Sequence, residues 1–179
     1  MEQALARIPP GQVKDVLDLG TGSGCIAITL ALERPLARVT AVDRSLAALA
    51  IAQRNADILN ARVEFLNSDW FAALAERRFD LIVSNPPYIA AADPHLARGD
   101  VRFEPLTALA AGTDGLDDLR TLTTAAPPHF KPGGTLLLEH GHDQADSVLA
   151  LLRKNGFHHP RSWSDLAGIW RVSGGKLSE

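Results

Sequence analysis

Two kinds of apolar segment alternate along this chain. Short apolar runs bounded by turn residues, such as Val13–Leu19 and Phe79–Val83, predict buried strands. Longer segments repeat apolar residues every three or four positions and predict helices. The helix predicted from Ser45 to Asn60 has one apolar face, made of Leu46, Leu49, Ala52, Ala56 and Leu59. This alternation is typical of an α/β fold with a mostly parallel sheet.

The remaining elements follow the same alternation. The other predicted strands are Arg38–Val42, Val63–Leu66, Thr135–Glu139, Phe157–Ser162 and Ile169–Ser173, and the other predicted helices are Cys25–Glu33, Leu116–Ala126 and Asp143–Asn155. Ser45 has the side chain of a helix N-cap, and Gly156 follows the last helix at a C-capping position. A loop of about twenty-five residues follows Tyr88, and loops of that length in a compact domain tend to be functional.

Composition and charge narrow the function classes. The 179 residues fit one domain, and a net charge of -3 argues against a broad nucleic-acid surface. The chain has no secretory leader and no long apolar run, so we expect a cytoplasmic protein without a membrane partner. The one cysteine, Cys25, argues against a disulfide or a cysteine metal site, and we expect it to be a small core residue. No metal is expected, because the spacing of the clustered histidines indicates exposed surface positions, with a structural role open for the first of them: His140, His142, His158 and His159.

The first strand ends in a glycine-rich loop, Asp18-Leu19-Gly20-Thr21-Gly22-Ser23-Gly24. A dinucleotide-binding loop would carry its third glycine where Cys25 stands, so the spacing differs from that pattern. The glycines allow a ligand to approach the backbone, and the following helix offers free N–H groups. Asp18 suits a cationic ligand, because a carboxylate can meet the ammonium group of a methionine moiety. The alternative is a tight turn without a ligand. The candidate cofactor-binding residues here are Asp18, Gly20, Thr21, Gly22, Ser23 and Gly24.

The next two predicted strands also end in residues suited to an adenosyl ligand. Asp43 can accept both ribose hydroxyls, or it can be a charge that favours the start of the next helix. Asp69 can accept a hydrogen bond from the adenine amino group. Trp70 can lie against the base, or it can pack in the core. Because ligands bind at the carboxyl ends of parallel strands, we expect these side chains to meet.

The fourth strand ends in Asn85-Pro86-Pro87-Tyr88, which carries the strongest chemical signal. The lone pair of a planar amide or amine nitrogen is delocalised, so this nitrogen is a poor nucleophile. The Asn85 side chain and the Pro86 carbonyl can accept its two N–H bonds, orient it and favour the positive charge that develops on it. The prolines fix φ, and Tyr88 offers an aromatic face for a planar group. The alternative is a rigid surface turn. We assign catalysis to Asn85, Pro86, Pro87 and Tyr88, and Asn85 also to cofactor binding.

These residues resemble one known family, the bacterial-type protein-(glutamine-N5) methyltransferases that modify peptide chain release factors. The resemblance spans nearly the whole chain and is carried by Val16–Gly24, Ala41–Asp43, Ser68–Trp70, Ile82–Ile89, Val101–Leu109, Leu137–Gly141, Asp165–Gly168 and Arg171–Val172. The Asn-Pro-Pro-Tyr motif is shared with nucleic-acid amino-methyltransferases, whereas Arg102–Leu109 narrows the resemblance to the glutamine methyltransferases.

The resemblance implies a Rossmann-like class I fold, with a doubly wound, seven-stranded, mostly parallel sheet whose last strand is antiparallel. It implies S-adenosylmethionine as cofactor, S-adenosylhomocysteine as product and the glutamine of a release factor's Gly-Gly-Gln motif as substrate. Residues 1–179 would form the catalytic domain, without the family's N-terminal helical domain, and Trp170 departs from the family pattern. Two alternatives stay open: an adenine or cytosine amino-methyltransferase acting on nucleic acid, and a fragment that binds the cofactor without turnover.

Overall fold

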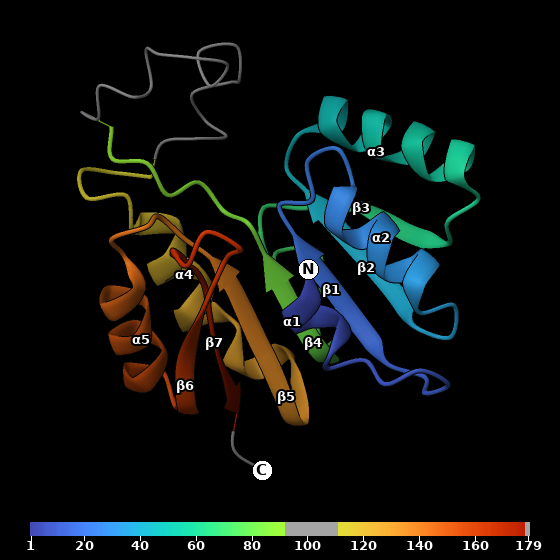
Figure 1. The fold of residues 1–179 in the computed structure, drawn as a ribbon. Coiled ribbons are helices and arrows are strands. Elements are labelled where there is room, and N and C mark those ends of the chain that lie inside the picture. Colours follow the sequence, from blue (N-terminus) through green and yellow to red (C-terminus); the bar gives the residue numbers. More distant parts are fainter. Residues whose placement is uncertain (92–110, 178–179) are drawn as a thin grey trace.

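The computed structural model describes residues 1–91 and 111–177, which build one seven-stranded sheet covered by helices on both faces (Figure 1). The segment Val101–Leu109, on which part of the family resemblance depends, lies outside the described residues. In chain order the strands are β1 Asp15–Leu19, β2 Arg38–Asp43, β3 Val63–Asn67, β4 Phe79–Ser84, β5 Phe130–Glu139, β6 Phe157–Ser164 and β7 Trp170–Leu177. The helices are α1 Glu2–Leu5, α2 Cys25–Glu33, α3 Leu46–Leu59, α4 Asp117–Ala125 and α5 Ala145–Lys154, with a short 3₁₀ helix, η4, at Pro127–His129.

The strand order is β3-β2-β1-β4-β5-β7-β6. All neighbouring pairs from β3 to β5 are parallel, and β7 runs antiparallel to both β5 and β6. The predicted doubly wound, mostly parallel sheet is therefore confirmed, including the antiparallel last strand. The winding direction reverses between β1 and β4, so the crevice outside their carboxyl ends is the place where such sheets bind ligands.

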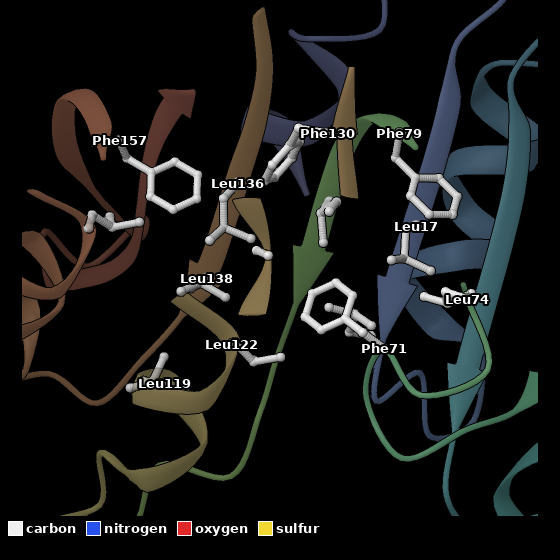
Figure 2. Close-up of a cluster of buried hydrophobic side chains, with 14 of the residues drawn as sticks. Leu17, Phe71, Leu74, Phe79, Leu119, Leu122, Phe130, Leu136, Leu138 and Phe157 are labelled. Atoms are coloured by element: carbon white, nitrogen blue, oxygen red, sulfur yellow. The ribbon is translucent and has the colours of Figure 1, made fainter. Parts of the chain in front are cut away.

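Side chains on the two faces of the sheet belong to two separate cores. Along β1, Val16 packs in the cluster shared with α1 and α2, whereas Leu17 and Leu19 pack in the cluster shared with α4 and α5. The second cluster is the larger one, and Figure 2 shows aromatic and leucine side chains from β4, β5 and α4 converging in it. Burial on both faces explains why the central strands are continuous apolar runs in the sequence.

Several predicted boundaries differ from the structure for identifiable reasons. Val13 is 57% exposed, and β1 begins only at Asp15. β5 begins at Phe130 rather than at the predicted Thr135, because Phe130 pairs with Phe79 across a register shift. The predicted apolar face of α3 is wrong at its ends: Leu46 and Leu59 are exposed, because the helix packs through the central residues Leu49, Ala52 and Ala56.

The helix termini follow the predicted capping. The Ser45 hydroxyl accepts a hydrogen bond from the N–H of Ala48 at 3.2 Å, as an N-cap does. Gly156 follows α5 with φ of 84°, the left-handed conformation that closes many helices. Both signals therefore fix where a helix begins or ends.

A cluster of charged side chains joins the amino ends of β1, β4 and β5. The Asp80 carboxylate accepts hydrogen bonds from Lys14 at 3.1 Å, from Lys131 at 2.8 Å and from the Asp15 N–H at 2.8 Å. Asp15 also binds Lys131 and Arg38. Burial raises the pKa of Asp80, but the hydrogen bonds from Lys131, the Asp15 backbone and Lys14 outweigh it and hold the pKa below its ordinary value.

Replacing Asp80 by alanine should lower the free energy of unfolding by about 1–2 kcal/mol, because it removes one acceptor shared by two lysines and a backbone N–H. Denaturant unfolding at neutral pH measures this. Since the folded-state pKa is depressed, the contribution is present above the ordinary aspartate pKa and is lost as the pH falls through the folded value. Asp57→Ala on the exposed face of α3 is the control, and an equal loss in both variants would contradict this assignment.

Candidate functional site

The carboxyl ends of the first four strands surround one cavity of about 650 Å³. Its lining includes Gly20–Ser23 of the glycine loop, Asp43, the Ser68–Trp70 segment, Asn85 and Pro87. The ends of the four strands therefore meet at one cavity, as predicted. Asp18, Gly24, Pro86 and Tyr88 are not among the lining residues and lie behind or beside the cavity.

The glycine loop is held in shape by the strand beside it. The N–H groups of Gly20 and Thr21 both donate to the carbonyl oxygen of Val42, at 2.9 and 3.0 Å. Gly20 has φ of 68°, and a Cβ atom there would lie 3.2 Å from the Trp70 ring. Gly24 has φ of 85°, and its Cβ would lie 2.9 Å from Ile28. Both positions need glycine, for conformation and for close packing.

Asp18 lies beneath the loop and is buried. One carboxylate oxygen accepts hydrogen bonds from the Thr21 hydroxyl at 2.7 Å and from the Ala27 N–H at 3.1 Å. The other oxygen, Oδ1, has no hydrogen-bond partner among the described residues. Burial raises the pKa of Asp18 to about 6, against the lowering effect of the two hydrogen bonds. The loop therefore closes around a negative charge that the protein itself only half satisfies.

Asp43 connects the glycine loop with the start of α3. One carboxylate oxygen accepts from the Gly22 N–H at 2.9 Å and the other from the Ser45 N–H at 2.8 Å. The side chain thus stands at the N-terminus of α3 and also lines the cavity, so the two interpretations of Asp43 are compatible. Each carboxylate oxygen still has a lone pair for a ligand hydroxyl.

Trp70 both packs in the core and lines the cavity, which reconciles its two interpretations. Its backbone has φ of 46°, and the Ser68 hydroxyl donates to its carbonyl oxygen at 2.9 Å. From α4, the carboxylate of Asp118 accepts a hydrogen bond from the Trp70 side chain. Burial raises the pKa of Asp118, Arg44 opposes that rise, and the like charge of Asp69 adds to it.

The segment after β4 is fixed at several points. The Ser84 hydroxyl donates to the Leu19 carbonyl oxygen at 2.7 Å and so ties β4 to β1. Asn85 is exposed at the cavity, whereas Pro86 is buried behind it. The Tyr88 carbonyl oxygen accepts from the Gln144 side chain at 3.0 Å, and the same amide accepts from the Gly141 N–H at 2.8 Å.

Behind this segment, His140 is fully buried and structural. Its two ring nitrogens lie 2.8 Å from the Gly141 carbonyl oxygen and 2.7 Å from the Ser173 hydroxyl. Burial lowers the pKa of His140. The other clustered histidines, His142, His158 and His159, are exposed, as predicted.

Sequence reasoning missed part of the cavity wall and misplaced one residue. Cys25 was predicted to be a core residue, which is wrong: as the first residue of α2 it is exposed and lines the cavity. The α3 side chains that line the cavity, including Ala48 and Ile51, had no distinctive signal. Asp118 comes from a distant part of the chain, and only its position in the first turn of a predicted helix could have drawn attention to it.

In residues 1–91 and 111–177, no group of three or more His, Cys, Asp or Glu side chains is arranged to hold a metal ion. In the same part of the chain, no helix is both long and apolar enough to cross a membrane.

Comparison with known proteins supports one family. The family model for the methyltransferase small domain matches residues 3–99. The chain is 53% identical to the release factor glutamine methyltransferase of Bordetella pertussis and 47% identical to that of Escherichia coli, over 99% and 98% of its own length. These matches cover 66% and 64% of the two relatives, so the chain spans just under two thirds of their length.

Solved structures agree with this grouping. The release-factor-specific protein-(glutamine-N5) methyltransferase of Alicyclobacillus acidocaldarius superposes with a TM-score of 0.59 at 33% identity, and the match covers 99% of this chain and 89% of that one. A Thermus thermophilus 16S rRNA methyltransferase, solved with AdoMet and guanosine, has a TM-score of 0.69 at 24% identity, over 98% of this chain and 40% of that one, and shows the shared fold. The chain belongs to the methyltransferase small domain family and, within it, to the release factor glutamine methyltransferases.

Proposed function

We propose that this chain is a catalytic domain that transfers a methyl group from S-adenosylmethionine to the side-chain amide nitrogen of the Gly-Gly-Gln glutamine in a peptide chain release factor. The observation that carries the proposal is that Asn85 and the first three strand ends open onto the same cavity. The relatives named as release factor glutamine methyltransferases supply the substrate class.

The donor set of the cavity fits S-adenosylmethionine. A volume of about 650 Å³ is within the range of small-molecule sites. The unpartnered Oδ1 of Asp18 keeps a negative charge beneath the glycine loop, which favours a ligand with ammonium and sulfonium groups. Asp43 would accept the ribose hydroxyls, and Asp69 and Trp70 would hold the adenine. When bound, S-adenosylmethionine supplies the electrophilic methyl group.

The segment that follows the carboxyl end of β4 would orient the glutamine amide nitrogen that accepts the methyl group. We assign the Asn85 side-chain oxygen and the Pro86 carbonyl to accept the two N–H bonds of the glutamine amide. This orients its nitrogen toward the methyl group and favours the developing positive charge. Buried Pro86 and the hydrogen bond from Gln144 to Tyr88 hold the segment in place before substrate arrives, so little reorganisation accompanies the reaction.

Mass spectrometry tests the proposed reaction. The chain is incubated with S-adenosylmethionine and a release factor produced without this modification, and the Gly-Gly-Gln peptide is then analysed. We expect one added methyl group on the glutamine side chain. Cofactor binding without any methylation of the release factor would overturn the proposed substrate for this chain.

Asn85→Ala should lower the rate of methyl transfer by about a hundredfold or more, because it removes one of two acceptors that orient the nitrogen and favour its charge. Single-turnover kinetics measures the transfer, and calorimetric titration with S-adenosylhomocysteine measures binding, which we expect to change far less. Asn155→Ala, at the end of α5, is the matched control. Equal transfer rates in Asn85→Ala and the control would contradict the assigned role.

Asp18→Asn should remove a pH-dependent part of the stability. Because the folded-state pKa of Asp18, about 6, lies above its ordinary value, the folded protein binds this proton more tightly than the unfolded chain. Protonation of Asp18 therefore stabilises the folded state fully at low pH, and this stabilisation is lost as the pH rises through about 6. The free energy of unfolding of the wild type, minus that of Asp18→Asn, should fall between about pH 4 and about pH 7. A difference that does not change with pH would show that Asp18 keeps an ordinary pKa.

A further inference from the structure

A second cavity, of about 570 Å³, lies between the end of the α1 segment and the strands β5, β6 and β7. Its lining includes three side chains that are cationic at neutral pH, Arg7, Arg161 and Lys176, and two histidines, His158 and His159. No acidic side chain is among the lining residues. None of these five residues belongs to the strand-end cavity described above.

Glycines and an irregular strand pairing create this hollow. Gly174 and Gly175 of β7 form part of its wall, and a Cβ at Gly174 would lie 2.4 Å from the Leu136 carbonyl oxygen. A side chain at Gly174 would therefore clash with the backbone of β5. The pairing of β6 with β7 shifts register between His158 and Arg161, and His159 has φ of 48°. This irregularity allows neighbouring residues of β6 to line the same cavity.

In the part of the chain that the structure describes, these cations have no carboxylate partner; the Arg7 guanidinium donates only to the uncharged carbonyl and side-chain oxygens of Gln3, at 2.6 and 3.1 Å. Among residues 1–91 and 111–177, no ion pair involves Arg7, Arg161 or Lys176, whereas Lys14, Lys131 and several arginines elsewhere are paired. The Arg7 guanidinium lies 4.6 Å from the centre of the Trp163 ring, and that of Arg161 lies 5.9 Å from it.

Charge repulsion is therefore built into this region. Burial lowers the pKa of Arg7, and the nearby charge of Arg161 lowers it further. Like charges held this close, without a compensating anion in the described residues, indicate a site that a bound anion would stabilise.

We propose that this cavity binds a ligand with two or more phosphate groups, of the size of a nucleotide. Guanidinium groups bind phosphate oxygens through paired hydrogen bonds, and an ammonium adds a point charge. Three cations that line one cavity can neutralise a compact polyanion. A single carboxylate would leave most of their positive charge uncompensated. The volume exceeds what one phosphate needs and is ample for a polyphosphate with a small organic group.

Calorimetric titration of the purified chain with pyrophosphate and with ATP, at constant ionic strength, tests the proposal. We expect one site, with affinity reduced about tenfold by Arg161→Gln and likewise by Lys176→Gln. Arg153→Gln, an exposed residue of α5 outside the cavity, is the matched control and should bind like the wild type. Thermal unfolding confirms that each variant is folded, and unchanged binding of S-adenosylhomocysteine separates this site from the strand-end cavity.

Two further ligands identify the source of the phosphate and the class of anion. A short single-stranded RNA that competes with pyrophosphate, and binds more tightly than ATP, would support the same site with RNA as the source of its phosphates. An oligoglutamate peptide that binds as tightly as pyrophosphate would overturn the proposal, because the cavity would then not select phosphate. Absence of pyrophosphate binding, or equal binding by wild type and both cavity variants, would overturn it as well.

Discussion

The turn that follows β1 is the constraint on which the site depends. Two backbone N–H groups of this turn, from Gly20 and Thr21, share one acceptor, the carbonyl oxygen of Val42 in β2. Beneath it, the buried carboxylate of Asp18 binds Thr21 and the first turn of α2. These contacts hold the end of β1, the start of α2 and the end of β2 in one arrangement, and the other lining residues are placed relative to it.

This arrangement is unfavourable in free energy, and the binding of a cationic ligand would offset part of that penalty. A buried carboxylate with one unpartnered oxygen is unfavourable in the ionised form, as the raised pKa of Asp18 reflects. A cationic ligand nearby would favour ionisation and lower that cost. The face of the β5–β7–β6 part of the sheet opposite α5 has the complementary imbalance: positive charge with no ion-pair partner among the described residues. Both features indicate that parts of this domain are organised for ligands rather than for maximal stability.

Sequence patterns predicted those parts of the fold and of the strand-end site that are determined by interactions between residues close together in the chain. The apolar runs of the central strands, the glycine loop and the cap at Ser45 all depend on near neighbours in the chain, and each was located correctly except for the first residues of β1 and β5. The cavity-lining residues that the sequence patterns did not predict are placed there by tertiary packing. Asp118 reaches Trp70 only because the start of α4 and the segment after β3, which are far apart in the sequence, line the same cavity. Cys25 is exposed because the turn before it directs the first residue of α2 toward the cavity.

In the proposed function, the four strand ends form one binding site for the methyl donor. The most direct measurement is a titration of the isotopically labelled chain with S-adenosylhomocysteine, followed residue by residue by nuclear magnetic resonance. We predict saturable binding at one site, with the largest shifts at Gly20–Gly24, Asp43, Asp69–Trp70 and Asn85. Absence of binding, or shifts concentrated away from these strand ends, would contradict the account.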